Sequence, residues 1–312
     1  MSNSRQIRNN RGIKPEKSGI TSLKDLKGFV SRVMEQIKHD HVQVVSAGVA
    51  FYFFLALFPT FAAIISIYGL VMDAAHVEQQ MSQIATNLPD QTQQMLSGIL
   101  HRLAGQSDQT LGWSLVISIL ISFWSANKGT SAVFEGVNIA YNEIDERNFF
   151  RKNGITILFT IGGIIAGFLC IIFVVGFPAF IDTLGLPSFL QTGISWLRWL
   201  LMAGIIILAL GLIYRIAPDR KKTEFRWLNW GAIIATILWV LGSMLFTLYV
   251  NNFGSYEKTY GSFAAVIILM LWFFLTAFII LLGAEINSEM ERQGENNHEV
   301  LQEEALKYGD PS

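Results

Sequence analysis

Five stretches of this chain are each long and apolar enough to cross a lipid bilayer as a helix. They cover residues 49–71, 155–180, 196–216, 230–250 and 263–284. A helix needs about 20 mostly apolar residues to span the hydrocarbon core. With 52% hydrophobic and 15% charged residues, the chain has more apolar surface than a soluble core could bury. We therefore predict an all-α, polytopic membrane protein.

A sixth crossing is predicted over residues 111–133, although small and polar residues follow residue 124. The loop charges favour this crossing. With six crossings, nineteen Lys and Arg residues fall on one side of the membrane and two on the other, and Lys128 and Arg198 lie at the boundaries. With five crossings this alternation is lost. Because cytoplasmic loops are enriched in Lys and Arg, both termini are predicted to be cytoplasmic.

The expected organisation is a basic cytoplasmic tail (1–42), a six-helix membrane domain (43–291) and an acidic cytoplasmic tail (292–312). Within the basic tail, residues 22–39 repeat apolar side chains at three- and four-residue spacing, which predicts an amphipathic helix. This helix either lies at the interface, attracted to anionic inner-leaflet lipid, or packs under the bundle. A second amphipathic region, 77–103, is predicted between the first two spans, as a structural lid or a partner-binding segment.

Polar residues follow one face of the sixth predicted span. Lys128 and Glu135 are seven residues apart, which places them on the same face of a helix, with Ser131 between them and Asn127 and Asn138 beside them. An ionisable group at membrane depth costs about 2.5–3.5 kcal/mol on insertion scales, so a functional or structural role is expected for such a group. We predict that this face lines a pathway and binds a solute.

Three further features are predicted to shape that pathway. Arg215 and Glu285 end their spans at similar depth and form either a gate or brace, or ordinary snorkelling or paired interface residues. Pro59 is predicted to kink the first span, because it cannot donate the helical hydrogen bond. Gly163 and Gly167 form a small-residue packing motif within the bundle or between protomers, so a homo-oligomer is possible.

Signatures of catalysis are thin. The five histidines lie outside the spans and form no helical zinc pair, the single cysteine is Cys170, and no phosphate-binding glycine loop is present. The acidic C-terminal tail and the loop charges do not have a nucleic-acid-binding composition. We expect no enzymatic activity, no cofactor, no metal site and no nucleic-acid partner.

Several local sequences together resemble the YihY/virulence factor BrkB family of bacterial inner-membrane proteins, over about residues 41–292. They are Ala50-Phe51-Tyr52, Ala56-Leu57-Phe58-Pro59, Trp124-Ser125-Ala126, Gly136-Val137-Asn138-Ile139-Ala140-Tyr141, Tyr214-Arg215-Ile216-Ala217-Pro218, Gly231-Ala232 with Trp239, Tyr249 through Tyr256, Tyr260-Gly261-Ser262 and Leu282-Gly283-Ala284-Glu285-Ile286-Asn287.

This resemblance implies an inner-membrane location but no substrate. The family was long labelled ribonuclease BN, a label now regarded as a misassignment, and its members are variously proposed to transport ions or envelope lipids. One member gave the family its serum-resistance name. Members often have an arginine in the Trp-Ser-Ala motif, where this chain has Lys128. A bidentate anion contact would therefore become a point charge here.

Two functional hypotheses follow. The first is a transporter or permease of an ion, amphiphile or envelope lipid, which binds or gates its solute through Lys128 and Glu135. The alternative is a non-transporting envelope scaffold or virulence factor that acts through protein or lipid interactions. The scaffold hypothesis predicts that Lys128 and Glu135 tolerate alanine, whereas deletion of residues 77–103 abolishes function.

Overall fold

The computed structural model describes residues 23–71, 108–176, 181, 187–220, 229–252 and 262–308. Over these residues the chain is helical and contains no β-strand, which confirms the all-α prediction. The elements in chain order are α1 (Leu23–His39), α2 (Val42–Val71), α5 (Asp108–Ala140), α6 (Phe149–Ile171) with the π-helical turn η1 (Ile172–Gly176), α8 (Ser188–Ile216), α9 (Trp230–Asn252) and α11 (Ser262–Tyr308).

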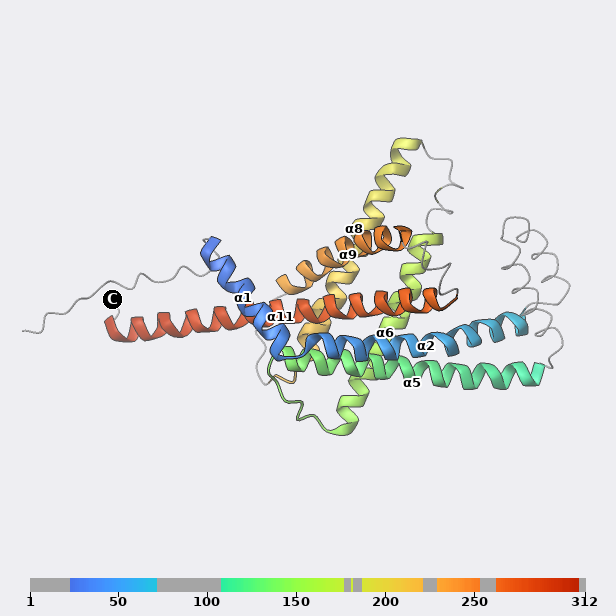
Figure 1. Ribbon diagram of the computed structural model, residues 1–312, viewed down its shortest axis with the longest axis horizontal. Coiled ribbons are helices and arrows are strands. Elements are labelled where there is room, and N and C mark those ends of the chain that lie inside the picture. The colour runs from blue at the N-terminus through green and yellow to red at the C-terminus, as the bar shows by residue number, and fades with distance from the viewer. Residues whose placement is uncertain are drawn as a thin grey trace, which may run out of the picture.

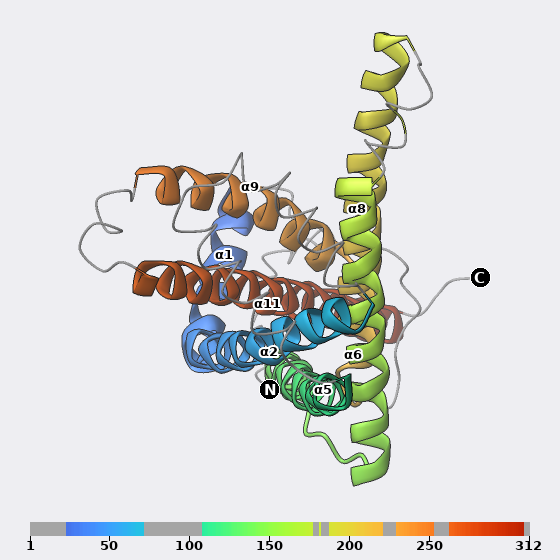
Figure 2. The ribbon, with the colours of Figure 1, turned by 90° about the vertical axis from the view of Figure 1, so that its right-hand side faces the viewer.

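Helix α11 lies at the centre of the arrangement. It packs against α2 and α5 on one side and α9 on the other, and α1 crosses it near its middle (Figure 1). Figure 2 shows α6 and α8 standing steeply across α2, α5 and α11. The ends of α1, α5, α8 and the middle of α11 therefore meet in one region.

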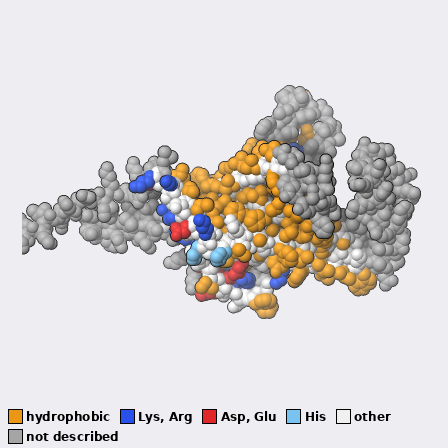
Figure 3. All heavy atoms as spheres, viewed as in Figure 1, with side chains coloured by type: hydrophobic (Ala, Val, Ile, Leu, Met, Phe, Trp, Pro, Cys, Tyr) orange, Lys and Arg blue, Asp and Glu red, His pale blue; other side chains and the backbone are white. Residues whose placement is uncertain are grey.

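Five of these helices, α2, α6, α8, α9 and α11, are long and apolar enough to cross a membrane. Most of their outward side chains are apolar, as a lipid solvent requires. Figure 3 shows the result: a broad hydrophobic surface covers the helices, and charged side chains gather mainly at the end where α1 lies. The molecule is therefore a membrane protein.

Helix α5 is the predicted sixth crossing. Its 33 residues give a length of about 50 Å. It lies beside α2 in both views and makes with it the most extensive helix packing among the described elements (Figures 1 and 2). The structure is consistent with six crossings, although α5 is not among the five helices that are long and apolar enough to cross a membrane. The sixth crossing stays a prediction.

Some helices are longer than the predicted spans. Helix α2 begins at Val42 and α8 at Ser188, each before its predicted start, and α11 continues to Tyr308 through the predicted acidic tail. Residues 285–308 are rich in Glu, which favours a helix even without an apolar environment. The predicted amphipathic region 77–103 lies outside the described residues.

Charged side chains gather where α1, the C-terminal end of α5 and the middle of α11 meet, and this region is the charged end of the molecule. Two non-glycine residues with left-handed backbone conformation shape it. His41 (φ 50°) forms the corner between α1 and α2, and Asn142 (φ 54°) follows the end of α5. After α5, the N–H of Glu143 donates to the carbonyl of Asn138, and that of Asn142 to Ile139. This is the Schellman pattern of a helix C-terminus, and asparagine tolerates its left-handed position better than most residues. It turns the chain toward α6.

Helix α1 packs on the bundle, which is one of the two alternatives left open by its sequence, and its contact with anionic lipid stays a prediction. Phe29, Val33 and Ile37 are buried in the core shared with α11, so the helix packs on the bundle. Leu26, Val30 and Met34 form a second apolar band that remains exposed. At 100° per residue, that band is bordered on its outer side by lysines: Lys24, Lys27 and Lys38.

Candidate functional site

The predicted polar face of α5 points outward from the bundle. Lys128 and Glu135 are exposed, and Ser131 between them is half-buried. Glu135 pairs with Lys152 of α6 at 3.3 Å. Within the part of the chain that is described, Lys128 has no hydrogen-bond or ion-pair partner. The face therefore carries an uncompensated cation on the outside of a helix that lies along a membrane-spanning one.

A polar seam joins α5 to α6 next to this face. The hydroxyl of Thr160 lies 2.9 Å from that of Thr130 and 3.2 Å from Asn127 Oδ1. Thr160 and Thr156 are buried, and each hydroxyl also reaches a backbone carbonyl of its own helix. Asn127, the sequence neighbour of Lys128, thus helps to hold α6 against α5.

Asn138 lies away from the exposed face and is buried at the end of α5. Its amide donates to the carbonyl of Phe134 and its Oδ1 accepts from the N–H of Asp219 at 3.2 Å. It therefore connects α5 to the segment that follows α8. This position favours a structural role over contact with a solute.

Arg147 is a central residue of the charged end that the sequence analysis did not single out. Its side chain is 8% exposed and donates to the last carbonyls of the α8 region: Ile216 (2.9 Å), Ala217 (3.3 Å) and Pro218 (2.8 Å). Its Nε donates to Asp219 Oδ1 at 3.1 Å. A cation at a helix C-terminus satisfies unpaired carbonyls and opposes the negative end of the helix dipole.

Tyr141 links α5 to α11 and to the loop after α8. The amide of Asn287 donates to its hydroxyl at 2.7 Å, and the guanidinium of Arg220 lies 3.8 Å from the centre of its ring. Arg220 in turn pairs with Glu291. Burial, and then the charge of Glu291, raise the pKa of the Tyr141 hydroxyl well above its usual value.

The same network continues into α1. Arg32 pairs with Glu289 at 2.5 Å. The Gln36 amide, oriented to satisfy both neighbours, donates to Glu285 Oε2 at 3.2 Å and accepts from Arg292. Arg292 also donates to the carbonyl of Ala140 at 3.1 Å. Through these bonds α1, α5 and α11 form one polar cluster.

The two predicted gate residues do not meet. Glu285 is fully buried, whereas Arg215 is exposed. Lys128 and Glu135 lie on the outer face of α5, and Glu135 pairs with Lys152. The structure therefore does not join the four predicted charges into one cluster. Glu285 belongs to the buried network, where it bridges to α1.

Pro59 lies inside α2, which continues through it to Val71. The hydroxyl of Thr60 donates to the carbonyl of Ala56 at 2.7 Å, within the turn that contains the proline. Side-chain hydroxyls of this kind help to satisfy backbone groups near a membrane proline. Among the described residues, no group of three or more His, Cys, Asp or Glu side chains could hold a metal ion.

Comparison with known proteins identifies the family. The model of the virulence factor BrkB family matches residues 33–306. The chain belongs to the virulence factor BrkB family. The local sequences that carried the resemblance supply much of the polar network: Asn138 from α5, Tyr141 directly after it, and Glu285 and Asn287 from α11.

Relatives in this BrkB family carry general names. A ribonuclease-like protein, YfkH, of Bacillus subtilis is 28% identical over 85% of this chain and 96% of its own length. UPF0761 membrane proteins of Alteromonas mediterranea and Idiomarina loihiensis are 40% and 38% identical, over 31% and 26% of this chain and 33% and 28% of their own lengths. No solved structure matches.

Proposed function

We propose that this protein is an inner-membrane transporter that moves an amphiphile or envelope lipid, with both termini in the cytoplasm. An amphiphile fits the geometry of this site better than an ion does. The polar face of α5 is open at the side of the bundle, so a polar headgroup can follow it while apolar chains stay in the surrounding lipid. An enclosed ion path would instead need these side chains to face inward.

One observation carries the proposal: Lys128 is exposed on the outer face of α5 without a partner among the described residues. A cation at membrane depth is stable only with water, a counter-ion or a polar ligand nearby. Ser131 and Glu135 extend the polar surface toward the charged end. An anionic or zwitterionic headgroup supplies the group that Lys128 lacks.

The test is lipid movement in reconstituted vesicles. Purified protein is inserted into vesicles whose inner and outer leaflets can be told apart with a fluorescent lipid and a membrane-impermeant quencher. Wild-type protein should move labelled lipid between leaflets, and Lys128→Ala should lose most of this activity. Lys128→Arg should keep it, because an arginine retains the charge.

Arg151→Ala is the matched control, because Arg151 is an exposed cation at the start of α6 that makes no ion pair with the polar face in the described structure. It should behave as the wild type. Vesicles in which the wild type moves no labelled lipid, or in which Lys128→Ala is fully active, would overturn the proposal.

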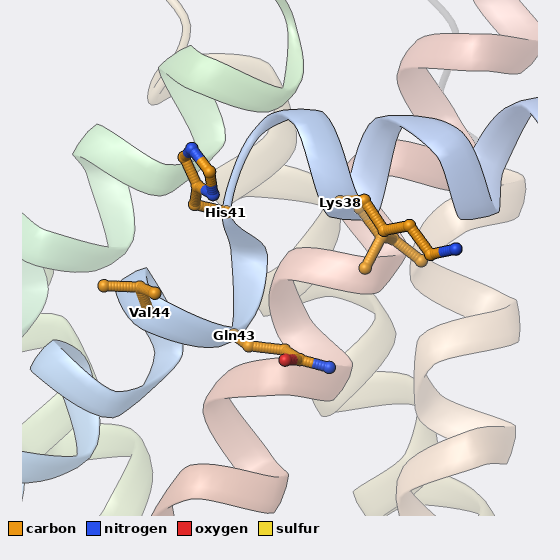
Figure 4. Close-up of a pocket in the computed structure, with 5 residues that line it drawn as sticks. Lys38, His41, Gln43 and Val44 are labelled. Atoms are coloured by element: carbon orange, nitrogen blue, oxygen red, sulfur yellow. The ribbon is translucent and has the colours of Figure 1, made fainter.

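The scaffold alternative has one observation in its favour: the exposed apolar band of α1, Leu26, Val30 and Met34, bordered by lysines. Such a surface suits the anionic inner leaflet, with apolar side chains at the acyl boundary and ammonium groups among the phosphates. At the corner between α1 and α2 a small hollow is lined partly by Lys38 and Gln43, which project to the same side (Figure 4). In either hypothesis, lipid contacts at this apolar band and at the neighbouring hollow would anchor the protein.

The homo-oligomer also stays a proposal. A Cβ at Gly163 or Gly167 of α6 would meet no atom within 4 Å in the described part of the chain, so no described helix packs closely on this small-residue face. A second copy is the occupant that the sequence motif suggests.

A further inference from the structure

The charged end contains an unusual carboxylate at Glu285. The neighbouring acids of α11 each have a cationic partner: Glu289 pairs with Arg32, and Glu291 with Arg220. Glu285 is 0% exposed, makes no ion pair in the described structure, and its Oε1 has no hydrogen-bond partner there. A buried carboxylate without a cation is strongly disfavoured in its ionised form.

A second buried acid faces Glu285 across the helix contact. Asp40 follows α1 at the corner with α2, and its side chain is 6% exposed. Its negative charge lies close enough to act on the carboxylate of Glu285. Two carboxylates can share a hydrogen bond only when one of them carries a proton. The arrangement resembles other paired acids, in which like charges at short range keep one group protonated.

Three other titratable groups near the pair have defined partners. On α1, the ring of His39 contacts Asp40 Oδ1 at 2.7 Å. On α11, Arg292 faces the pair, but its guanidinium donates to Ala140 and Gln36. On α8, the Tyr214 hydroxyl donates to the Ile280 carbonyl at 2.7 Å. Residues 42–50 of α2 and 230–240 of α9 contain no titratable side chain.

We propose that Asp40 and Glu285 form a proton-binding site, in which one shared proton keeps α1 docked on α11. With the proton bound, the pair carries a single negative charge, and Arg292 stands opposite it. Release of the proton places two buried anions face to face and pushes α1 away from the bundle. The site stands on its own, whereas its use to couple solute movement to protons rests on the proposed transport function.

The direct test is infrared difference spectroscopy of the full-length protein in lipid vesicles, titrated with alkali. A protonated carboxylic acid has a carbonyl band that its ionised form lacks. The wild type should show this band at neutral pH and lose it as the pH rises. Glu285→Gln should lack it throughout, and the matched control Glu289→Gln, which removes the acid paired with Arg32 one turn further along α11, should retain it.

A second measurement follows the helix contact itself. Hydrogen exchange of α1, corrected for the intrinsic effect of pH, should rise in the wild type over the range where the band disappears. In Glu285→Gln, a neutral side chain of the same shape, α1 should stay protected at alkaline pH. This reads the proton site without any assay of transport, so its failure and the failure of lipid movement are separate results.

Two results would overturn the proposal. One is a wild-type spectrum at neutral pH without a protonated-carboxyl band, or with a band that persists in Glu285→Gln. The other is exchange of α1 that depends on pH equally in the wild type and in Glu285→Gln.

Discussion

At the scale of single residues, Arg147 holds the segment after α8 in place, although Arg147 itself lies in the loop between α5 and α6. Its guanidinium satisfies three carbonyls and Asp219 in a nearly buried site. Arg147→Ala leaves these groups without their donor and should lower the free energy of unfolding by about 3–5 kcal/mol, the usual result of breaking a buried pair. Thermal unfolding in detergent measures this, with the exposed Arg151→Ala as the control.

Arg147→Lys should recover only part of that loss, because an ammonium group cannot donate to four acceptors in a planar fork. A variant Arg147→Ala that unfolds at the wild-type temperature would show that the loop is held by other contacts.

Tyr141 gives the network a dependence on alkaline pH. Burial raises the pKa of its hydroxyl, so the folded state keeps the phenol neutral where the unfolded chain would ionise it. The unfolded state then binds fewer protons, and stability falls as the pH rises above about 10, the ordinary pKa of tyrosine. Tyr141→Phe should reduce this fall, measured as unfolding temperature against pH, and should slightly destabilise the protein at neutral pH by removing the Asn287 hydrogen bond. An unchanged alkaline profile would contradict the assignment.

At the scale of helices, the crossing of α9 and α11 depends on two glycines. A Cβ on Gly231 would clash with the carbonyl of Gly283, and one on Gly283 would clash with the hydroxyl of Tyr214 and lie 2.7 Å from the Cβ of Ala235. Gly231→Ala and Gly283→Ala should therefore force the backbones apart and sharply lower the unfolding temperature.

Gly162→Ala in α6 is the matched control, because no described neighbour lies within 4 Å of its Cβ position. Alanine has the higher helix propensity, so this variant should be neutral or slightly stabilised. Similar unfolding temperatures for all three alanine variants would show that the close crossing does not exist.

At the scale of the whole molecule, the number of crossings decides where the C-terminus lies. Six crossings place both termini on the same side, whereas five place them on opposite sides. Reporter fusions at the C-terminus should therefore give a fluorescent cytoplasmic reporter and an inactive periplasmic one. The opposite pattern would mean that α5 does not cross.

The sequence could predict the helices but not the polar network. Apolar runs located α2, α6, α8, α9 and α11 because lipid imposes a strong local requirement on composition. The roles of Arg147, Tyr141 and Asp40 could not be predicted, because their partners lie far away along the chain. Their surroundings follow only from helix packing. A usable signal existed, since polar residues at the ends of apolar helices need partners. The sequence also could not predict that Lys128 points out of the bundle, because periodicity shows which residues share a helix face but not what that face contacts.

The central claim is that the polar face of α5 is wetted at membrane depth, and cysteine accessibility tests it most directly. After Cys170→Ala, single cysteines are placed along 125–142 and treated with membrane-permeant and impermeant thiol reagents. The account predicts labelling by the impermeant reagent at 128, 131 and 135, and protection at the buried Val133 and Val137. A further single cysteine at Leu120, which is exposed but apolar and should face lipid, should not react. Protection of 128, 131 and 135 as well would contradict a polar path and leave the scaffold hypothesis as the better account.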